Sequence, residues 1–256
     1  MALDGKVAII TGASTGIGAG IAAVMAREGA SVVIDYVGNG TEQAQQVVDG
    51  ITSAGGKAIA VQADITNQAD VQKLIGEAVS TYGKLDIFVN NAGIEHKVPF
   101  LETSLDLWNK VITVNLTGPF ICTLAAAQQM VKQGNGGRII NISSVHEDLP
   151  MPTNSPYCAS KGGLRMFMRT ICLELAPHKI TVNNIGPGAV DTSMDADLKA
   201  NKPLYDELLS EIPLGRMGQP EEVGKLAAYL ASDDAAYITG STYFIDGGLM
   251  RYAKSL

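Results

Sequence analysis

Cysteine is scarce in this sequence, and positive charge is outnumbered by negative charge. Only three cysteines occur in 256 residues, Cys122, Cys158 and Cys172, and no two of them form a C-x-x-C pair. This pattern argues against a disulfide framework and a zinc site, so we expect no metal and a reducing, cytoplasmic setting. Lysine and arginine number 19 against 26 aspartates and glutamates, a net charge of −7 without a basic run. Nucleic acid and anionic membranes are therefore poor candidate partners.

The sequence also lacks a long apolar segment at its start and a break in composition. The opening MALDGKVAIITGAS is too short and too interrupted by glycine for a signal peptide or a membrane span. We find no Ser/Pro-rich linker, internal repeat or low-complexity tract. Because 46% of the residues are hydrophobic, the chain can bury one substantial core, and we expect a single domain over residues 1–256.

Short apolar runs alternate with helix-length segments along the chain. The runs are KVAIIT, ASVVIDY, KAIAVQ, LDIFVN, GRIINIS, ITVNNI and STYFID, and the segments span 16–28, 41–54, 67–82, 103–132 and 156–176. Runs that are apolar throughout are typical of strands covered on both faces. The alternation predicts an α/β fold with a doubly wound, mostly parallel sheet of about seven strands. The stretch 187–220 mixes prolines, charges and short helical pieces, which indicates a substrate loop or lid, or else a surface decoration.

The glycine-rich stretch TGASTGIG follows the first predicted strand and opens the first predicted helix. Its spacing, Gly12-x-x-x-Gly16-x-Gly18, lets the turn close and lets a pyrophosphate approach the backbone at a helix N-terminus. Glycines collect in structural turns as well. The strand before and the helix after favour a dinucleotide site over such a turn.

The second predicted strand bears on which dinucleotide binds. Asp35 lies 17 residues after Gly18, close to where an acid would contact an adenosine ribose. No lysine or arginine occurs from 28 to 56, whereas a 2′-phosphate normally needs a cation. We therefore predict NAD in preference to NADP, which remains possible, with Tyr36 as the alternative residue at the ribose position. Asp64 follows the third strand and either accepts the adenine amino group or caps the next helix.

Tyr157 and Lys161 in YCASK stand four residues apart, on one face of a predicted helix. A tyrosine with an unperturbed pKa of about 10 is a poor base near neutral pH, but an adjacent ammonium favours the phenolate. Such a tyrosine could take a hydroxyl proton while hydride leaves the same carbon. Ser144 ends the strand GRIINIS, so it should emerge at the carboxyl edge of the sheet, where ligands bind. The Tyr-x-x-x-Lys spacing alone is common on solvated helix faces, so the prediction depends on its neighbours.

Six motifs occur in order: TGASTGIG, NNAG at 90–93, VNLTG, Ser144, YCASK and PGAV at 187–190. With them the sequence resembles the short-chain dehydrogenase/reductase family over essentially its whole length. The resemblance implies a Rossmann-type fold, a nicotinamide cofactor, a small-molecule alcohol or carbonyl substrate, and a homotetramer formed through the segments 103–132 and 156–176 and the C-terminal region.

The resemblance also implies a catalytic tetrad. Tyr157 would be the general acid/base, and Lys161 would lower the tyrosine pKa and bind the nicotinamide ribose. Ser144 would orient the substrate oxygen, and Asn115 would hold a water of the proton relay. The residues expected at the cofactor site are Gly12, Ser14, Thr15, Gly16, Ile17, Gly18, Asp35, Tyr36, Asp64, Ile65, Asn91, Ala92, Gly93, Tyr157, Lys161, Pro187, Gly188, Val190 and Thr192.

Within that family, NNAGIEHKVP, SSVHE, YCASKGG and NNIGPGA resemble the glucose 1-dehydrogenases. Glu95 and His146 stand where that subgroup has residues near the sugar, and both can bond hydroxyls beside Ser144. The alternative is that they are exposed loop residues without a ligand role. Asp195 is a third expected substrate contact. Val37 replaces a basic residue often found in that subgroup, which weakens the transfer of NADP use.

We therefore predict an enzyme that moves hydride between a sugar or polyol hydroxyl, at C1 of glucose or a related aldose, and the nicotinamide. The alternative is a 3-oxoacyl-(acyl carrier protein) reductase or another carbonyl reductase, which the family motifs permit equally. Such reductases generally prefer NADPH and display a basic docking surface for the acidic carrier protein. The net acidity of this chain and its cation-free second strand count against this alternative. A non-catalytic nucleotide-binding sensor ranks last because the tyrosine and lysine are both present.

Overall fold

The centre of the fold is a seven-stranded parallel sheet. The computed structural model describes residues 1–192 and 196–251. The strands are β1 (Val7–Ile10), β2 (Ser31–Tyr36), β3 (Lys57–Gln62), β4 (Ile87–Asn90), β5 (Gly137–Ile142), β6 (Ile180–Pro187) and β7 (Thr242–Ile245). Their order is β3-β2-β1-β4-β5-β6-β7, and every neighbouring pair is parallel. The predicted α/β fold and its seven strands are confirmed.

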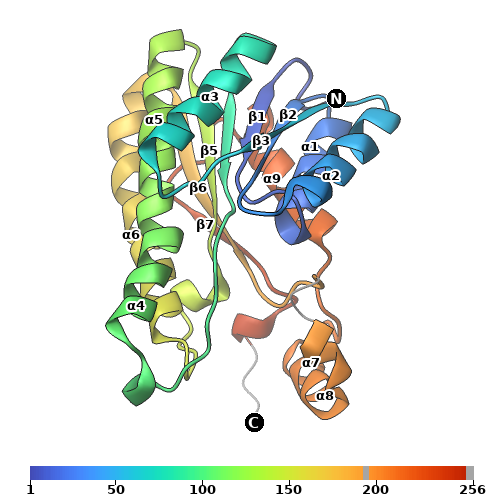
Figure 1. Ribbon diagram of the computed structural model, residues 1–256, viewed down its shortest axis with the longest axis vertical. Helices are drawn as coiled ribbons and strands as arrows, with labels where there is room; N and C mark the ends of the chain where they lie inside the picture. The colour runs from blue at the N-terminus through green and yellow to red at the C-terminus, as the bar shows by residue number, and fades with distance from the viewer. Residues whose placement is uncertain (193–195, 252–256) are drawn as a thin grey trace.

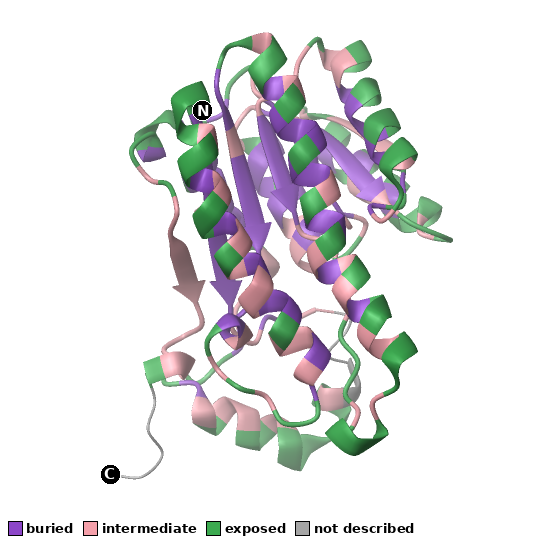
Figure 2. Ribbon diagram, turned by 90° about the vertical axis from the view of Figure 1, so that its left-hand side faces the viewer, coloured by how far each residue is buried: buried purple, intermediate pink, exposed green. Residues whose placement is uncertain are grey.

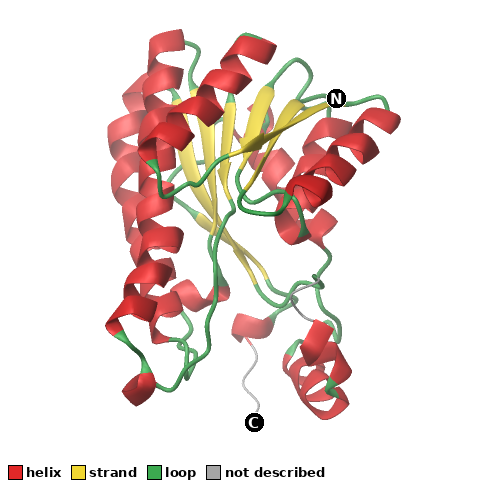
Figure 3. Ribbon diagram, in the orientation of Figure 1, coloured by secondary structure: helices red, strands yellow, loops and turns green. Residues whose placement is uncertain are grey.

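Two helical layers cover the two faces of this sheet (Figures 1 and 3). One layer holds α1 (Gly16–Arg27), α2 (Thr41–Ser53) and α9 (Pro220–Ala231); the other holds α3 (Gln68–Tyr82), α4 (Leu105–Ile112), α5 (Gly118–Gln133) and α6 (Ser155–Leu175). Successive strand residues face opposite layers. Ala8 and Ile10 pack into the core on the α1 side, whereas Val7 and Ile9 pack into the core on the α5 side. The strands are mostly apolar for this reason, and Figure 2 shows most of them buried.

The chain reverses its direction across the sheet at β1. It runs from β1 outward through β2 to β3, and then returns to β4 on the other side of β1. Connections that leave to opposite sides open a crevice at the carboxyl ends of these strands, where ligands bind in open α/β sheets. The short helices α7 (Ala196–Ala200) and α8 (Lys202–Glu211), which belong to the predicted 187–220 segment, lie beyond that edge (Figure 1).

The segment predicted as one helix over 103–132 is divided. α4 and α5 are joined by a π-helical turn, Thr113–Thr117. Ser104 caps α4 by accepting a hydrogen bond from the Leu107 N–H at 3.1 Å. A π-helical turn inserts an extra residue into a helix and is frequently found at functional sites. Periodicity does not show such an insertion, so the sequence predicted a single uninterrupted helix.

The helical run Leu105–Gln133 is long and apolar enough to cross a membrane by length and composition, with a mean hydropathy of 1.4. Half of its most apolar window is buried inside the protein. It packs between α3 and α6 on one face of the sheet. This packing is typical of a core helix, in which the apolar face contacts the sheet.

Candidate active site

A cleft of about 700 Å³ opens at the carboxyl ends of β1, β4, β5 and β6. It collects most of the predicted site residues, although they come from distant parts of the sequence. The predicted residues that line it are Gly12, Ser14, Thr15, Gly16, Ile17, Asp35, Tyr36, Asp64, Ile65, Asn91, Ala92, Gly93, Glu95, Ser144, His146, Tyr157, Lys161, Pro187, Gly188, Val190 and Thr192. Gly18 and Asn115 are not part of its lining, and Asp195 lies outside the described residues.

The glycine loop after β1 forms one wall of the cleft and needs its glycines. Gly12 and Gly16 have φ of +60° and +57°, which side chains rarely adopt. A Cβ at Gly18 would lie 2.5 Å from the Asn91 Nδ2, so this glycine allows close packing behind the loop instead of touching a ligand. Thr15 precedes α1 without a side-chain capping bond, so the first N–H groups of the helix are free of a cap. This cradle suits the pyrophosphate of a dinucleotide.

Thr11, which was not predicted from the sequence, fastens the glycine loop to the NNAG turn. Its Oγ1 accepts hydrogen bonds from the Asn91 and Ala92 N–H groups, at 2.9 and 3.0 Å. In return the Asn91 side chain donates to the carbonyls of Thr11 and Gly12, at 2.8 and 3.1 Å. The two cofactor-side loops are therefore one hydrogen-bonded unit. A threonine that ends a buried strand was the only sequence signal for this role.

Asp35 lies beneath the glycine loop and is only 2% exposed. Its Oδ2 accepts a hydrogen bond from the Gly12 N–H at 3.1 Å, and its Oδ1 is buried without a partner among the described residues. Burial raises the pKa of this carboxyl to about 7, against the lowering effect of the Gly12 N–H. The structure thus gives Asp35 the task of holding the loop, and its contact with an adenosine ribose stays a prediction.

Asp35→Asn should stabilise the cofactor-free protein in alkaline solution. The folded-state pKa lies above the ordinary value of 3.8, so the folded protein holds an extra proton between these two values and loses free energy of unfolding as pH rises through them. The three-unit shift corresponds to about 4 kcal/mol at most. We expect the variant to gain about 1–3 kcal/mol in urea unfolding at about pH 8 and to lose this advantage at about pH 4. An equal difference at both pH values would show that the charge of Asp35 is not the cause.

Asp64, exposed at the rim of the cleft, is engaged locally. Its Oδ1 accepts hydrogen bonds from the Thr66 N–H and hydroxyl, at 2.8 and 2.7 Å. The cap of α3 is Asn67, whose Oδ1 accepts from the Ala69 N–H at 2.9 Å. The carboxylate therefore stabilises the turn that leads into the helix, and its contact with adenine stays a prediction.

Ser144, Tyr157 and Lys161 meet at the centre of the cleft. Ser144 and Tyr157 both line the cleft, the Ser144 side chain acts to lower the pKa of Tyr157, and the Lys161 Nζ lies 5.5 Å from the centre of the tyrosine ring. The ammonium also donates to the Ile142 carbonyl at 2.9 Å. A nucleophilic or basic oxygen, its orienting serine and a buried cation are thus within reach of one substrate atom.

Burial dominates the proton affinities of this group. It raises the pKa of Tyr157 to about 12. The Ser144 side chain acts to lower this pKa, and the Glu95 charge acts to raise it. Burial also lowers the pKa of Lys161 to about 8, against the charges of Glu147 and Glu95. The protein without cofactor therefore does not show the predicted lowering of the tyrosine pKa. For the enzyme with bound cofactor, this lowering stays a prediction.

Asn115 sits in the π-helical turn, one layer behind the cleft, and is 1% exposed. Its side-chain oxygen accepts from the Ile94 N–H at 2.8 Å, and its Nδ2 donates to the Ile94 carbonyl at 2.9 Å and to the Ser160 hydroxyl at 3.3 Å. Ser160 in turn donates to the Tyr157 carbonyl at 2.7 Å. The extra residue of the π turn thus ties the loop after β4 to the helix that carries Tyr157, and a water-holding role stays a prediction.

Glu95 and His146 flank the reactive tyrosine at the mouth of the cleft. The His146 and Tyr157 rings are 6.3 Å apart, edge to face. The His146 Nδ1 lies 3.1 Å from the Leu149 carbonyl, which can only accept, so the proton is on Nδ1 and Nε2 is the acceptor of the neutral ring. The Glu95 carboxylate forms an ion pair with Lys97 at 3.5 Å. Two hydrogen-bonding side chains are therefore available beside the reactive oxygen.

The opposite side of the cleft is apolar, which sequence reasoning missed. Its members come from the loop after β5, from α7 and α8, and from the C-terminal region: Met151, Leu198, Leu208 and Leu249. Only the periodic leucines of α7 and α8 gave a hint of this wall. Among the described residues, no group of three His, Cys, Asp or Glu side chains is placed to hold a metal ion.

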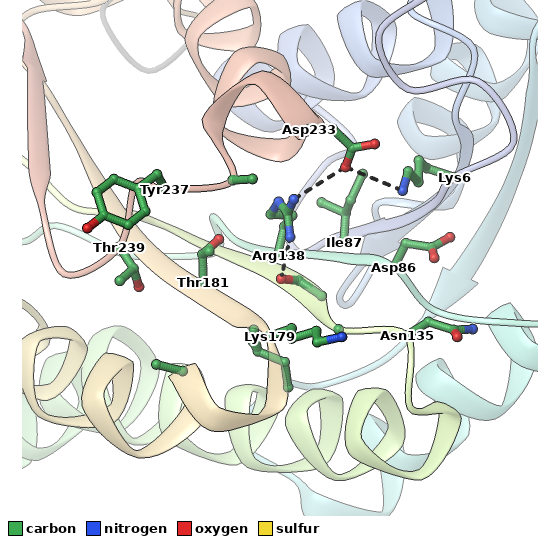
Figure 4. Close-up of a pocket in the computed structure, with 15 residues that line it drawn as sticks. Lys6, Asp86, Ile87, Asn135, Arg138, Lys179, Thr181, Asp233, Tyr237 and Thr239 are labelled. Atoms are coloured by element: carbon green, nitrogen blue, oxygen red, sulfur yellow. Dashed lines mark hydrogen bonds and ion pairs between the residues drawn. The ribbon is translucent and has the colours of Figure 1, made fainter.

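A second cavity, of about 740 Å³, lies at the opposite, amino edge of the sheet (Figure 4). Its charges are largely paired with one another: the Asp233 carboxylate lies 3.3 Å from the Arg138 Nη2 and 3.8 Å from the Lys6 Nζ. None of the predicted catalytic, cofactor or substrate residues is among the described residues that line it. We therefore place the active site in the carboxyl-edge cleft, although it is slightly smaller.

Comparison with known proteins gives the same family throughout. The profile described as enoyl-(acyl carrier protein) reductase matches residues 12–250. Glucose 1-dehydrogenase 2 of Bacillus subtilis is 40% identical, covering 99% of this chain and 98% of that protein. The 3-oxoacyl-[acyl-carrier-protein] reductase of Synechocystis is 43% identical, covering 98% and 99%. A short-chain type dehydrogenase/reductase from Mycobacterium marinum superposes with a TM-score of 0.90 at 38% identity, covering 96% of each chain.

Proposed function

Because this chain belongs to the short-chain dehydrogenase/reductase family, we propose that it oxidises C1 of glucose or a related aldose, with NAD as the preferred acceptor. The observation that carries this proposal is the pair of Glu95 and His146 in the same cleft as Ser144 and Tyr157, with the His146 ring against the tyrosine ring. A sugar presents several hydroxyls next to its reacting carbon, and a carboxylate and an imidazole acceptor can each bind one of them. The relationship to a glucose 1-dehydrogenase supports the same substrate.

The reaction follows from the order of groups in the cleft. Tyr157 takes the proton of the sugar hydroxyl as general base, and Ser144 holds that oxygen in line with the tyrosine. Lys161, fixed on the Ile142 carbonyl, stabilises the phenolate by its charge and would bind the nicotinamide ribose. The nicotinamide, when bound, supplies the hydride acceptor. In the reverse direction Tyr157 returns its proton to a carbonyl oxygen.

The substrate segment 187–220 would cover the bound sugar. Leu198 of α7 and Leu208 of α8 already line the cleft. An apolar cover excludes water from the reacting carbon and strengthens the electrostatic interactions beneath it. Asp195, which lies outside the described residues, stays an expected substrate contact.

The proposal is tested directly by turnover. Purified protein should reduce NAD when glucose is added, at a rate that saturates with sugar concentration. Absence of turnover with glucose and with a panel of other aldoses and polyols would contradict the proposal.

The preference for NAD is supported by the surroundings of Val37. This side chain is 65% exposed just after β2 and lines the cleft, and the chain from 28 to 56 contains no lysine or arginine. A 2′-phosphate placed there would find no cation in the stretch from 28 to 56 to pair with.

Val37→Arg should therefore shift the preference toward NADP. A charge-assisted bond to the phosphate should raise kcat/KM for NADP by about 10- to 100-fold and leave that for NAD nearly unchanged. Val37→Gln, which adds length without charge, is the control. An unchanged ratio in the arginine variant would mean that the ribose lies elsewhere.

A second candidate function is reduction of a 3-oxoacyl group on an acyl carrier protein, or of another carbonyl. The apolar wall of Met151, Leu198, Leu208 and Leu249 favours it, because an acyl chain could lie there. A 3-oxoacyl-[acyl-carrier-protein] reductase is also among the relatives. The acidic net charge and the cation-free β2 region count against it. A non-catalytic sensor is disfavoured by the assembled Ser144–Tyr157–Lys161 group.

We further propose a homotetramer in the cytoplasm. Large apolar side chains are exposed on the outer faces of α4, α5 and α6, among them Leu105, Phe120, Leu124, Met166 and Leu173, and a second copy could cover them. The edge strand β7 is only partly buried. The three cysteines are free, in keeping with a reducing compartment.

A further inference from the structure

Glu147 is a buried carboxylate directly behind the reactive serine. It ends the 3₁₀ turn Val145–Glu147, which Ser144 caps by accepting the His146 N–H at 3.1 Å. The Glu147 side chain is 0% exposed. A buried carboxylate is costly unless hydrogen bonds or a cation compensate it. Glu147 has no part in the mechanism described above, so its burial there needs a reason.

A chain of amide side chains crosses the sheet and ends on this carboxylate. Asn90, Asn141 and Asn184 stand opposite one another on β4, β5 and β6. Asn90 donates to the Asn141 oxygen at 2.9 Å, and Asn141 donates to the Asn184 oxygen at 2.9 Å. Asn184 then donates to the Glu147 Oε2 at 3.2 Å. All the N–H dipoles of this chain point toward Glu147, which favours its charged form.

The other oxygen of Glu147 faces the Arg165 guanidinium at a distance too long for a hydrogen bond. Oε1 has no hydrogen-bond partner among the described residues and lies 3.7 Å from the Arg165 Nε, whose guanidinium is also paired with Asp148. Lys161 precedes Arg165 by four residues on α6, so both cations lie on the helix face that Glu147 approaches. The negative charge of Glu147 also raises the pKa of Lys161, against the lowering caused by burial. Glu147 thus acts on two cations of α6, one at the surface and one beneath the active site.

The remaining charges around Lys161 act less directly. Glu95 approaches from the loop after β4 and acts in the same direction as Glu147, but it is exposed and paired with Lys97. Strand β6, which also packs against the turn, carries no ionisable side chain. The ionisable groups facing the pair from the packed elements are Glu95, Lys97, His146, Asp148, Tyr157, Cys158 and Arg165.

We propose that Glu147 is a positioning residue that keeps Lys161 an ammonium beneath Tyr157, and that the Asn90–Asn141–Asn184 chain holds its carboxylate in place. This inference rests on the proposed oxidoreductase function but not on the identity of the substrate. Glu147 touches neither substrate nor cofactor, and it acts only through the lysine.

Glu147→Gln tests this role, because the amide oxygen can still accept from Asn184 while the charge is lost. Without the carboxylate, Lys161 should lose its proton at a lower pH. The alkaline limb of the kcat profile should therefore move down by about one pH unit. The profile is measured with glucose and NAD or, if no sugar is turned over, with acetoacetyl thioester and NADPH, so failure of the sugar proposal leaves this test intact.

A matched control and a variant of opposite sign complete the experiment. Glu174→Gln makes the same change at an exposed position of α6 and should leave the profile unmoved. Arg165→Met removes the other cation paired with Glu147, so Lys161 should keep its proton to a higher pH and the alkaline limb should move upward. This variant provides a test even if Glu147→Gln does not fold. A Glu147→Gln profile that coincides with the wild type, or an Arg165→Met limb that stays in place or moves down, would overturn the proposal.

Discussion

Tyr157→Phe should lower kcat by about 10³-fold or more, because the variant removes the oxygen that we expect to take the substrate proton. Phenylalanine keeps the ring that packs edge to face with His146 and beneath which Lys161 lies, so the fold and the cofactor wall should persist. The dissociation constant for NADH should stay within about threefold, since the glycine loop and Lys161 are intact. Stopped-flow turnover and fluorescence titration of NADH measure the two quantities.

Tyr237→Phe is the matched control for this change. Tyr237 is fully exposed at the amino edge of the sheet, beside the second cavity (Figure 4). It should retain full activity. If Tyr157→Phe kept more than about a tenth of the wild-type kcat, the base would have to be another group.

The second large effect is expected at Glu95 and His146. Replacing the charged acceptor of a sugar hydroxyl by a neutral one, in Glu95→Gln, or removing the acceptor, in His146→Leu, should reduce kcat/KM for glucose by about 10- to 100-fold, and the double variant by about 10³-fold. The loss should appear mainly as a higher KM, because these groups bind the substrate and do not transfer its proton.

Two neighbouring residues serve as controls. His96→Leu and Glu102→Gln make the same chemical changes at exposed positions that do not line the cleft. Steady-state kinetics should show that neither control variant changes kcat/KM for glucose. If the Glu95 and His146 variants had the same kcat/KM for glucose as these controls, the two residues would not bind the sugar. The proton transfer at Tyr157 would be unaffected by that result.

The sequence predicts those features that depend on local patterns. The glycine spacing predicts a closed turn after the first strand, and Gly12 and Gly16 have the positive φ that this turn uses. The seven runs are long enough for strands and are mostly apolar without a regular alternation of polar residues, which predicts burial between two helical layers. Ser144 at the end of β5 and Tyr157 early in α6 follow from these elements once the sheet is parallel.

The features that the sequence does not predict depend on contacts between distant segments. The burial of Asp35 follows from the glycine loop folding over the end of β2, 23 residues away from Gly12. The amide chain that ends on Glu147 requires Asn90, Asn141 and Asn184 to be in register on three strands, and no single strand carries that information. The π-helical turn at Asn115 alters the helical period by one residue, which an apolar pattern does not reveal.

A direct competition of substrates tests whether the cleft binds an aldose. In one preparation, kcat/KM is measured for glucose, other aldoses and polyols, and an acetoacetyl thioester, each with NAD(H) and NADP(H). We predict the highest kcat/KM for an aldose with NAD. A higher value for the acetoacetyl thioester with NADPH, together with no turnover of any sugar, would contradict it.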